Sequence, residues 1–276
     1  MQLAPGRGRG SELLNVDAMS EPAELRYDVE DHVGIITINR PAARNALTWS
    51  TYAALEDAVR TTTARCLVVT GADPAFCSGD DVRQVMGGGD TPPPVVDRTP
   101  RLTPAADALL HTDVPVIAAV NGAAVGWGME LAMFADIRVA SERAKFGELF
   151  VLRGLVSDVG GLGRLASLVG REKAAELLFT GDVIPAEEAL RIGLVSRVVP
   201  HDELLPTALG LAHRIAANPP LAVQRLKRGL REAIDPDWEE LGRWVSANLA
   251  ELFQTNDHRE GVKSFLEKRP PVYTGT

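Results

Sequence analysis

Two glycine-containing turns have the residues needed to stabilise a developing negative charge. Residues 71–81 (GADPAFCSGDD) leave the β-branched segment CLVVTG, and residues 121–132 (NGAAVGWGMELA) leave PVIAAV. Gly79 in the first turn, and Gly126 and Gly128 in the second, allow backbone conformations that other residues avoid. Two such turns could converge two backbone N–H groups on one oxygen, each worth roughly 3–4 kcal/mol. Each turn alone also fits an ordinary strand-to-helix connection.

Two acidic residues lie in apolar surroundings near predicted helix starts. Glu130 follows the second turn, next to Met129, Leu131 and Ala132, and Asp158 stands just before a glycine pair. A buried carboxylate is costly unless it is used or paired, and burial raises its pKa toward neutrality. Such a pair could act as general acid and base. Each residue also has a structural alternative: Glu130 could complement the helix dipole, and Asp158 could cap a helix.

Other catalytic or metal-binding patterns are absent from the sequence. It contains no H-E-x-x-H, G-x-S-x-G or G-x-x-x-x-G-K-[ST] motif, and residues 161–166 match a dinucleotide pattern only weakly. Five histidines show no ligand spacing: His32, His111, His201, His213 and His258. Cys66 and Cys77 lack a nearby base, and we interpret both as structural. We therefore predict no metal ion and no cofactor.

Composition excludes several classes of protein. The 276 residues carry 29 basic and 37 acidic side chains, a net charge of −8, which argues against a nucleic-acid or anionic-membrane surface. Hydrophobic residues make up 45%, enough for a packed core, and no apolar run is long enough to cross a bilayer. The first twenty residues lack the apolar core of a secretory signal, so we expect a cytoplasmic protein.

The order of predicted elements indicates an α/β fold with parallel strand pairing. Strands are expected at residues 25–29, 33–39, 66–71, 115–122 and 137–140, and helices at 48–63 and 128–136. Asp81 is expected to start a further helix. After a strand near residue 197, four helices are expected at 203–217, 221–234, 238–255 and 258–268.

These elements divide the chain into three parts. We predict a flexible N-terminal tail at residues 1–23, a core at 24–200 and a C-terminal helical region at 201–276. Residues 87–100, with three glycines and four prolines, are predicted to form a mobile loop. The helical region has more apolar positions than one small core should leave exposed, which predicts self-association. They are Trp238, Leu241, Trp244, Val245, Leu249 and Leu252.

Four segments, in this order, resemble the enoyl-CoA hydratase/isomerase, or crotonase, family. They are residues 33–47 (VGIITINRPAARNAL), 68–82 (VVTGADPAFCSGDDV), 115–147 (PVIAAVNGAAVGWGMELAMFADIRVASERAKFG) and 177–200 (LLFTGDVIPAEEALRIGLVSRVVP). The resemblance implies a crotonase-like spiral of ββα units with a C-terminal helical trimerisation region, and homotrimers that often pair into hexamers. It also implies an acyl-CoA substrate, whose enolate oxygen is held by the backbone N–H groups of Asp80 and Trp127. Coenzyme A would be part of the substrate.

The resemblance also assigns roles to side chains by position. Glu130 matches the first catalytic glutamate of typical hydratases, but Phe150 stands where the second glutamate is expected. Asp158 lies where dienoyl-CoA isomerases and the chlorobenzoyl-CoA dehalogenase place a working aspartate, and Ser157 replaces a frequent proline. Glu148, two positions before Phe150, is expected to point elsewhere. Residues implied in substrate or coenzyme A binding are Arg44, Ser78, Gly79, Gly126, Phe150 and Lys268.

Three functions remain open at this stage. The first is hydration of an enoyl-CoA thioester, or a shift of its double bond, with Glu130 and Asp158 sharing the proton transfers. The second is hydrolysis or displacement, with Asp158 as the nucleophile. The third is a non-catalytic acyl-CoA binder, which the two retained carboxylates disfavour. Residues 87–100 are expected to border the acyl entrance, because they follow the first turn.

Overall fold

The computed structural model describes residues 23–85, 102–235 and 237–276. The predicted tail, apart from its last residue, and the predicted loop at residues 87–100 lie outside this range. Among the described residues, no helix has the length and apolar character needed to cross a membrane. The cytoplasmic location stays a prediction.

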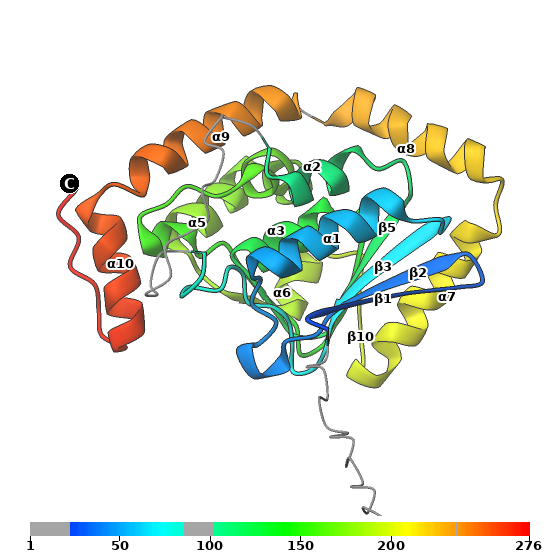
Figure 1. The fold of residues 1–276 in the computed structure, drawn as a ribbon, viewed down its shortest axis with the longest axis horizontal. Helices are drawn as coiled ribbons and strands as arrows, with labels where there is room; N and C mark the ends of the chain where they lie inside the picture. The colour runs from blue at the N-terminus through cyan, green and yellow to red at the C-terminus, as the bar shows by residue number, and fades with distance from the viewer. Residues whose placement is uncertain (1–22, 86–101, 236) are drawn as a thin grey trace, which may run out of the picture.

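Two β-sheets form the centre of the molecule (Figure 1). The larger sheet has the strand order β1 (Leu25–Glu30), β2 (Val33–Ile38), β3 (Cys66–Gly71), β5 (Val116–Val120), β7 (Ile137–Ser141) and β10 (Arg197–Val199). The smaller sheet has the order β4 (Ala75–Cys77), β6 (Ala123–Val125), β8 (Lys145–Gly147) and β9 (Ile184–Pro185). The β1–β2 and β8–β9 pairs are antiparallel, and the others are parallel.

From β3 to β8, consecutive strands alternate between the two sheets, which gives the chain its spiral. In the pairs β3–β4, β5–β6 and β7–β8, the first strand joins the larger sheet and the second joins the smaller one. Helix α2 (Pro104–His111) follows the first pair, and α3 (Trp127–Phe134) follows the second. The predicted spiral of ββα units is therefore present. Strands β4, β6 and β8 have three residues each, too few to show a periodic pattern in the sequence.

Strand alternation sends side chains of the larger sheet to two separate cores. Leu67 and Val69 of β3 face a core shared with α1 (Trp49–Thr61), α2 and α3, whereas Cys66 and Val68 face the opposite side. That side is covered by α7 (Leu204–Ala216). Helix α7 presents residues four positions apart to the sheet: Leu204, Ala208, Ala212 and Ala216. The functional turns leave the sheets between these layers.

The C-terminal region is helical, as expected. Helices α7, α8 (Pro220–Ile234), α9 (Trp238–Leu252) and α10 (Asn256–Glu267) begin and end within three residues of the predicted limits. Helices α8 and α9 form an arch along one side of the molecule, and α10 packs against the short turn Phe150–Arg153 (Figure 1). Lys227 ties the arch to the core, because its buried Nζ lies 2.8 Å from Asp136 Oδ2 and donates to the Val114 carbonyl.

Three shorter helices complete the described elements. They are α4 (Ala166–Val169), α5 (Arg171–Thr180) and α6 (Ala186–Arg191). The helix predicted to start at Asp81 stays a prediction, because residues 82–85 form a single turn at the end of the described range 23–85. The Asp81 carboxylate accepts the N–H groups of Arg83 and Gln84, and the Asp81 carbonyl accepts the Val85 N–H, which is the hydrogen bonding of a helix N-cap.

The contact between α3 and β4 leads to a prediction on stability. A Cβ atom on Gly128 would lie only 2.0 Å from the Cys77 carbonyl oxygen, so Gly128→Ala must push α3 away from β4. We expect the free energy of unfolding to fall by roughly 1–3 kcal/mol, the usual cost of overpacking, in urea denaturation. Gly229→Ala is the control, because no atom outside its own helix lies within 4 Å of that position. This variant should be stabilised by up to about 1 kcal/mol. Equal effects in both variants would contradict the interpretation.

Candidate active site

The two glycine turns are in direct contact. A Cβ atom on Gly79 would lie 2.9 Å from the Val125 carbonyl oxygen and 3.3 Å from the Trp127 nitrogen. Gly79 has φ +87° and Gly126 has φ +55°, values that L side chains rarely adopt. Only glycine therefore allows the turn that follows β4 to approach the turn that precedes α3 this closely.

Two backbone N–H groups are free where the turns meet. Gly79 and Asp81 both hydrogen-bond to Leu47, which leaves the N–H of the intervening Asp80 on the opposite side of the chain. Trp127 is the first residue of α3, so its N–H has no acceptor within the helix. Across the described residues, neither N–H donates to a carbonyl or side chain. These are the two groups that the sequence predicts for the oxyanion hole.

A cavity of about 60 Å³ opens beside these two groups. Its wall is formed by Ser78, Gly79, Asp80, Val82, Gly126, Trp127, Leu149, Phe150, Arg153 and Phe265. All predicted binding residues except Arg44 and Lys268 belong to it. The Arg44 carbonyl accepts the Ser78 N–H, while its side chain is exposed, and the exposed Lys268 lies just after α10. Sequence reasoning missed Arg153 and Phe265, because only the packing of α10 on residues 150–153 brings them together.

Asp80 contributes a half-buried carboxyl as well as its N–H group. Tyr52 Oη donates a hydrogen bond to Asp80 Oδ1 at 2.5 Å. Burial raises the pKa of Asp80 to about 6, against the effect of this hydrogen bond. Burial also raises the pKa of Tyr52, and the Asp80 charge adds to that shift. No local pattern indicates Tyr52 as a site residue, because it comes from α1, 28 positions before Asp80.

Trp127 holds the carboxyl of Asp158 through its side chain. The indole Nε1 donates to Asp158 Oδ2 at 3.0 Å, and the Val159 N–H donates to Oδ1 at 2.7 Å. Burial raises the pKa of Asp158, and these two hydrogen bonds oppose the shift. Trp127 belongs to the cavity wall and Asp158 does not, so the indole lies between the cavity and the Asp158 carboxyl. The ring is fixed by edge contacts with Tyr52 and Phe134, at centroid distances of 4.7 and 5.6 Å.

Glu130 is fully buried on α3 and connected to a second glutamate. Its carboxylate accepts the Gly161 N–H, and its Oε1 lies 2.8 Å from the hydroxyl oxygen of Ser157. That hydroxyl oxygen is also 2.7 Å from Glu148 Oε2. Burial raises the pKa of Glu130 well above its usual range, and the Glu148 and Asp158 charges add to this. Burial raises the pKa of Glu148 to about 8.

The expectation that Glu148 points elsewhere is wrong. Phe146 lies in β8 and Glu148 follows the last residue of that strand, and both side chains are buried. The contact of Glu148 Oε2 with Ser157 shows that Glu148 points toward Glu130. The structure thus brings together three buried carboxyls and one half-buried carboxyl around the meeting turns: Glu130, Glu148 and Asp158, with Asp80 in the cavity wall. Glu130 does lie in the first turn of α3, as its structural alternative requires, whereas the Asp158 carboxyl accepts only the Val159 N–H from the helix that follows it and not the later N–H groups that a helix cap binds.

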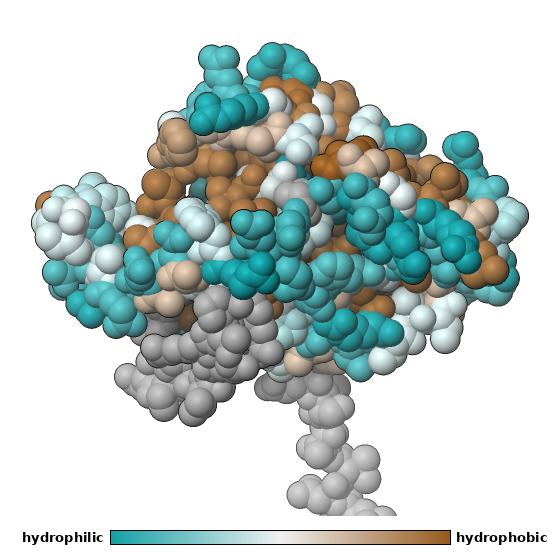
Figure 2. Space-filling model, turned by 90° about the horizontal axis from the view of Figure 1, so that it is seen from above, coloured by the Kyte–Doolittle hydropathy of each residue, from teal (hydrophilic) through white to brown (hydrophobic). Residues whose placement is uncertain are grey.

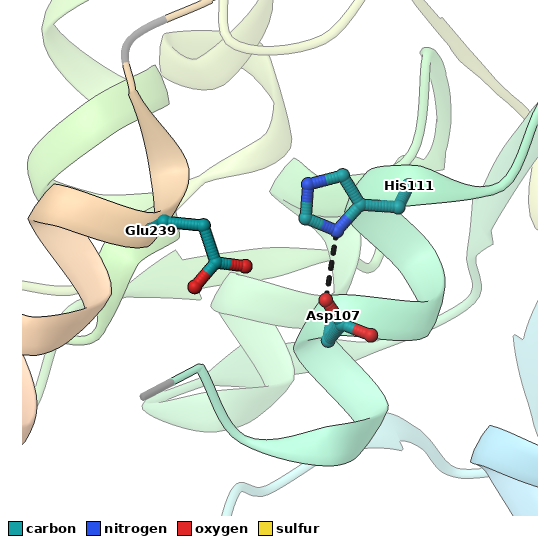
Figure 3. Close-up of side chains that lie close together, drawn as sticks. All are labelled: Asp107, His111 and Glu239. Atoms are coloured by element: carbon teal, nitrogen blue, oxygen red, sulfur yellow. Dashed lines mark hydrogen bonds and ion pairs between the residues drawn. The ribbon is translucent and has the colours of Figure 1, made fainter. Parts of the chain in front are cut away.

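A cluster with metal-ligand chemistry lies outside the site. Figure 3 shows Asp107 and His111 from α2 beside Glu239 from α9, with ligand atoms within 4.8 Å of one another. Both Asp107 oxygens already have partners: Oδ1 contacts His111 Nδ1, and Oδ2 accepts from Arg60. The Arg60 guanidinium would repel a bound cation. We interpret the cluster as a polar network that joins α1, α2 and α9.

Three residues form a serine–histidine–aspartate contact set elsewhere in the chain. His201 Nδ1 lies 3.1 Å from Ser141 Oγ, and His201 Nε2 lies 3.1 Å from Asp73 Oδ2. In a serine hydrolase the serine is accessible and the aspartate is buried. Here Ser141 is fully buried and Asp73 is exposed. A nucleophile that no substrate can reach cannot react, so this set is structural. Burial likewise raises the pKa values of Cys66 and Cys77 to about 12, which keeps both thiols protonated.

The fold and the site together define a class of enzyme. A ββα spiral that brings two turns into contact, with two N–H groups that have no acceptor among the described residues and buried carboxyls beside them, is suited to stabilising an enolate formed from a thioester. The enoyl-CoA hydratase/isomerase family model matches residues 28–276.

Individual relatives agree with this match. The chain is 38% identical to the crotonyl-CoA hydratase of Syntrophomonas wolfei, with 87% of this chain and 94% of the relative covered. It is 36% identical to the 2,3-dehydroadipyl-CoA hydratase of Escherichia coli, with 92% and 99% covered. The structure superimposes on the enoyl-CoA hydratase/isomerase of Pseudoalteromonas atlantica with a TM-score of 0.82, at 29% identity, over 91% of this chain and 100% of the other.

The chain therefore belongs to the enoyl-CoA hydratase/isomerase family. It is an enzyme of the enoyl-CoA hydratase type that acts on acyl-CoA thioesters. The crotonase resemblance of the sequence and the fold that it implied are confirmed.

The indole hydrogen bond leads to a prediction on pH dependence. Trp127→Phe keeps an aromatic ring but removes the donor that stabilises ionised Asp158, so the pKa of Asp158 should rise further. The limb of the pH–turnover profile that Asp158 governs should move to higher pH. The measurement is turnover of an acyl-CoA substrate across the pH range, with Trp244→Phe on the exposed side of α9 as the control. An unchanged pH–turnover profile would show that Asp158 takes no part in the reaction.

Proposed function

We propose that this enzyme hydrates the double bond of an enoyl-CoA thioester. The observation that carries the proposal is the contact of the two turns, where the N–H groups of Asp80 and Trp127 have no acceptor among the described residues. These groups would hold the thioester oxygen as negative charge develops on it. Relatives named as crotonyl-CoA and 2,3-dehydroadipyl-CoA hydratases support hydration.

The buried carboxyls would then move the protons. Addition of water places a hydroxyl group on C3 and a proton on C2, so one group must take a proton from water and another must deliver one. We assign these roles to Glu130 and Asp158, whose buried positions keep their pKa values raised. The small cavity, with Trp127 and Phe150 in its wall, favours a short acyl group over a long one.

A double-bond shift is the second candidate. Phe150 stands where a second catalytic glutamate is expected, whereas Asp158 is present and lies one hydrogen bond behind the wall. A shift moves a proton from C4 to C2 and needs no water, so one carboxyl that takes and returns the proton would suffice. Displacement by Asp158 is disfavoured, because both of its oxygens accept hydrogen bonds and its side chain is buried.

Substitution of the two carboxyls tests the assignment. Glu130→Gln and Asp158→Asn should each lower turnover by roughly 10²–10⁴, the range for loss of a general acid or base. Incubation with a panel of enoyl-CoA thioesters, read by mass spectrometry, should show the mass of one added water. An isomer of unchanged mass would favour the second candidate, and released coenzyme A would favour hydrolysis. The control is Glu251→Gln, an exposed residue of α9 that should keep full turnover.

If Asp158→Asn keeps full turnover while Glu130→Gln abolishes it, Asp158 has a structural role only. If both variants keep full turnover, proton transfer lies outside this pair and the mechanism is wrong.

We also propose a homotrimer or a pair of trimers, mostly on different residues from those that the sequence indicated, of which only Trp244 is exposed. Trp238 and Val245 are buried in this chain's own core, and Leu241, Leu249 and Leu252 pack against it, so they are not free for a partner. Apolar side chains are exposed on α8 instead, at 59–69% of their surface: Leu221, Leu226, Leu230 and Ile234. Figure 2 looks onto the side that carries α8 and α9, and hydrophobic residues gather there. Such a patch is typical of an interface.

Light scattering tests the oligomer. The protein at micromolar concentration should have the mass of three or six chains, and the double variant Leu226→Glu/Leu230→Glu should give a lower mass because it places charge in the contact. Val29→Glu, at an exposed position of β1, should leave the mass unchanged. A monomeric wild-type protein would contradict the proposal.

A further inference from the structure

A single hydroxyl group connects two buried glutamates beside the site. Ser157 Oγ lies 2.8 Å from Glu130 Oε1 and 2.7 Å from Glu148 Oε2, both ordinary hydrogen-bond distances. A hydroxyl group has one proton and can donate to only one of these two oxygens. The second contact therefore needs a proton from a carboxyl, because two oxygens that both lack a proton would repel at this distance.

Burial also indicates that one of the two glutamates, Glu130 or Glu148, is protonated. Glu130, Glu148 and Ser157 are almost fully removed from solvent, and the Asp158 carboxyl faces the pair from the segment before Gly160. Asp80 and Tyr52 lie beyond Asp158 on the cavity side. Two adjacent ionised carboxylates in such surroundings would repel strongly. Within the described residues, Glu148 Oε1 has no hydrogen-bond partner, so nothing there favours its ionised form.

We propose that Glu130 and Glu148 share one proton through Ser157, and that Glu148 stores the proton that Glu130 exchanges with the substrate. The inference rests on the proposed role of Glu130 in proton transfer. It accounts for the enzyme's ability to work with Phe150 where a second catalytic glutamate is expected: the second carboxyl is still present, two positions earlier, and reaches Glu130 through a hydroxyl group. Glu148 and Ser157 are positioning residues in this scheme, because they act on the substrate only through Glu130.

The proton path balances at each step. Before the reaction, Glu148 is protonated and donates to Ser157, whose own proton points to ionised Glu130. When Glu130 takes a proton from the reacting group, that carboxyl is neutral. The path resets when Glu130 returns this proton to the substrate. Alternatively, Glu148 passes its proton to Ser157 while Ser157 passes its proton to ionised Glu130, which leaves Glu148 ionised and Glu130 ready to act as an acid.

Infrared spectroscopy of the ligand-free protein tests the shared proton without any substrate. Protonated carboxyls have a C=O stretch that is separate from the bands of carboxylates and shifts in D₂O. We expect wild type at neutral pH to show a band that is absent from both Glu148→Gln and Glu130→Gln. In each variant the new amide donates to Ser157, and the remaining glutamate can stay ionised. If each variant loses a different band, or neither loses any, the proton is not shared.

Kinetics test the storage role. Ser157→Ala and Glu148→Gln should lower kcat at neutral pH by roughly tenfold or more and change KM little, because neither residue belongs to the cavity wall. Ser157→Thr keeps the hydroxyl group and should restore most of kcat. Since the pKa of Glu148 is about 8, the wild-type kcat should fall as pH rises through this value and the stored proton is lost. Glu148→Gln should lack that alkaline decline. Ser167→Ala, at an exposed serine of α4, is the matched control.

The outcomes separate this inference from the proposed function. If wild type turns over enoyl-CoA thioesters but Ser157→Ala and Glu148→Gln keep its kcat and its pH profile, the storage role is wrong while the function stands. If no enoyl-CoA thioester reacts, the function is wrong, and the storage role, which rests on it, falls as well. In that case the infrared bands still decide whether the proton is shared.

Discussion

The contact between the turn after β4 and the turn before α3 is the constraint on which the site depends. Gly79 can lie against the Trp127 nitrogen because it has no side chain, and Gly126 allows the turn before α3 through its positive φ. The alternation of strands between the two sheets delivers both turns to the same point, and the hydrogen bonds of Leu47 with Gly79 and Asp81 fix the direction of the Asp80 N–H. The fold therefore places two donors before any substrate binds, which is the condition under which they stabilise charge most effectively.

A second constraint follows from what surrounds those donors. Three carboxyls lie in a part of the molecule that water barely reaches, Asp80 lies half-buried beside them, and burial raises the pKa of all four. Three have a nearby donor, which is Tyr52 for Asp80, Trp127 for Asp158 and the Gly161 N–H for Glu130, and Glu148 contacts the Ser157 hydroxyl group. The cost of burial is thus reduced without supplying a positive charge, which would lower the pKa values and remove the buried protons. A site arranged in this way retains protons near neutral pH.

The sequence predicts the parts of this arrangement that are local. The β-branched segments predict strands of the larger sheet, and Gly79 and Gly126 predict the two turns that meet in the structure. Features that depend on distant packing were missed. Tyr52 and Phe265 reach the site from α1 and α10, and no spacing in the sequence relates them to residues 79–80 or 150–153. The sequence does not distinguish the exposed apolar stripe on α8 from the apolar residues of α9. In the structure, the apolar residues of α9 mostly pack on their own chain.

Glu148 shows why a position-by-position comparison is not enough to locate a carboxyl. A comparison by position shows phenylalanine at residue 150, where a glutamate is expected. In the structure the buried Glu148, just after β8, is the carboxyl that is connected to Glu130. Ser157, in place of a frequent proline, supplies the hydroxyl group that spans the remaining gap. Glu148 and Ser157 act together, because Glu148 reaches Glu130 only through the Ser157 hydroxyl group. The substitution at residue 150 therefore changes the shape of the cavity wall more than it changes the number of carboxyls that the site contains.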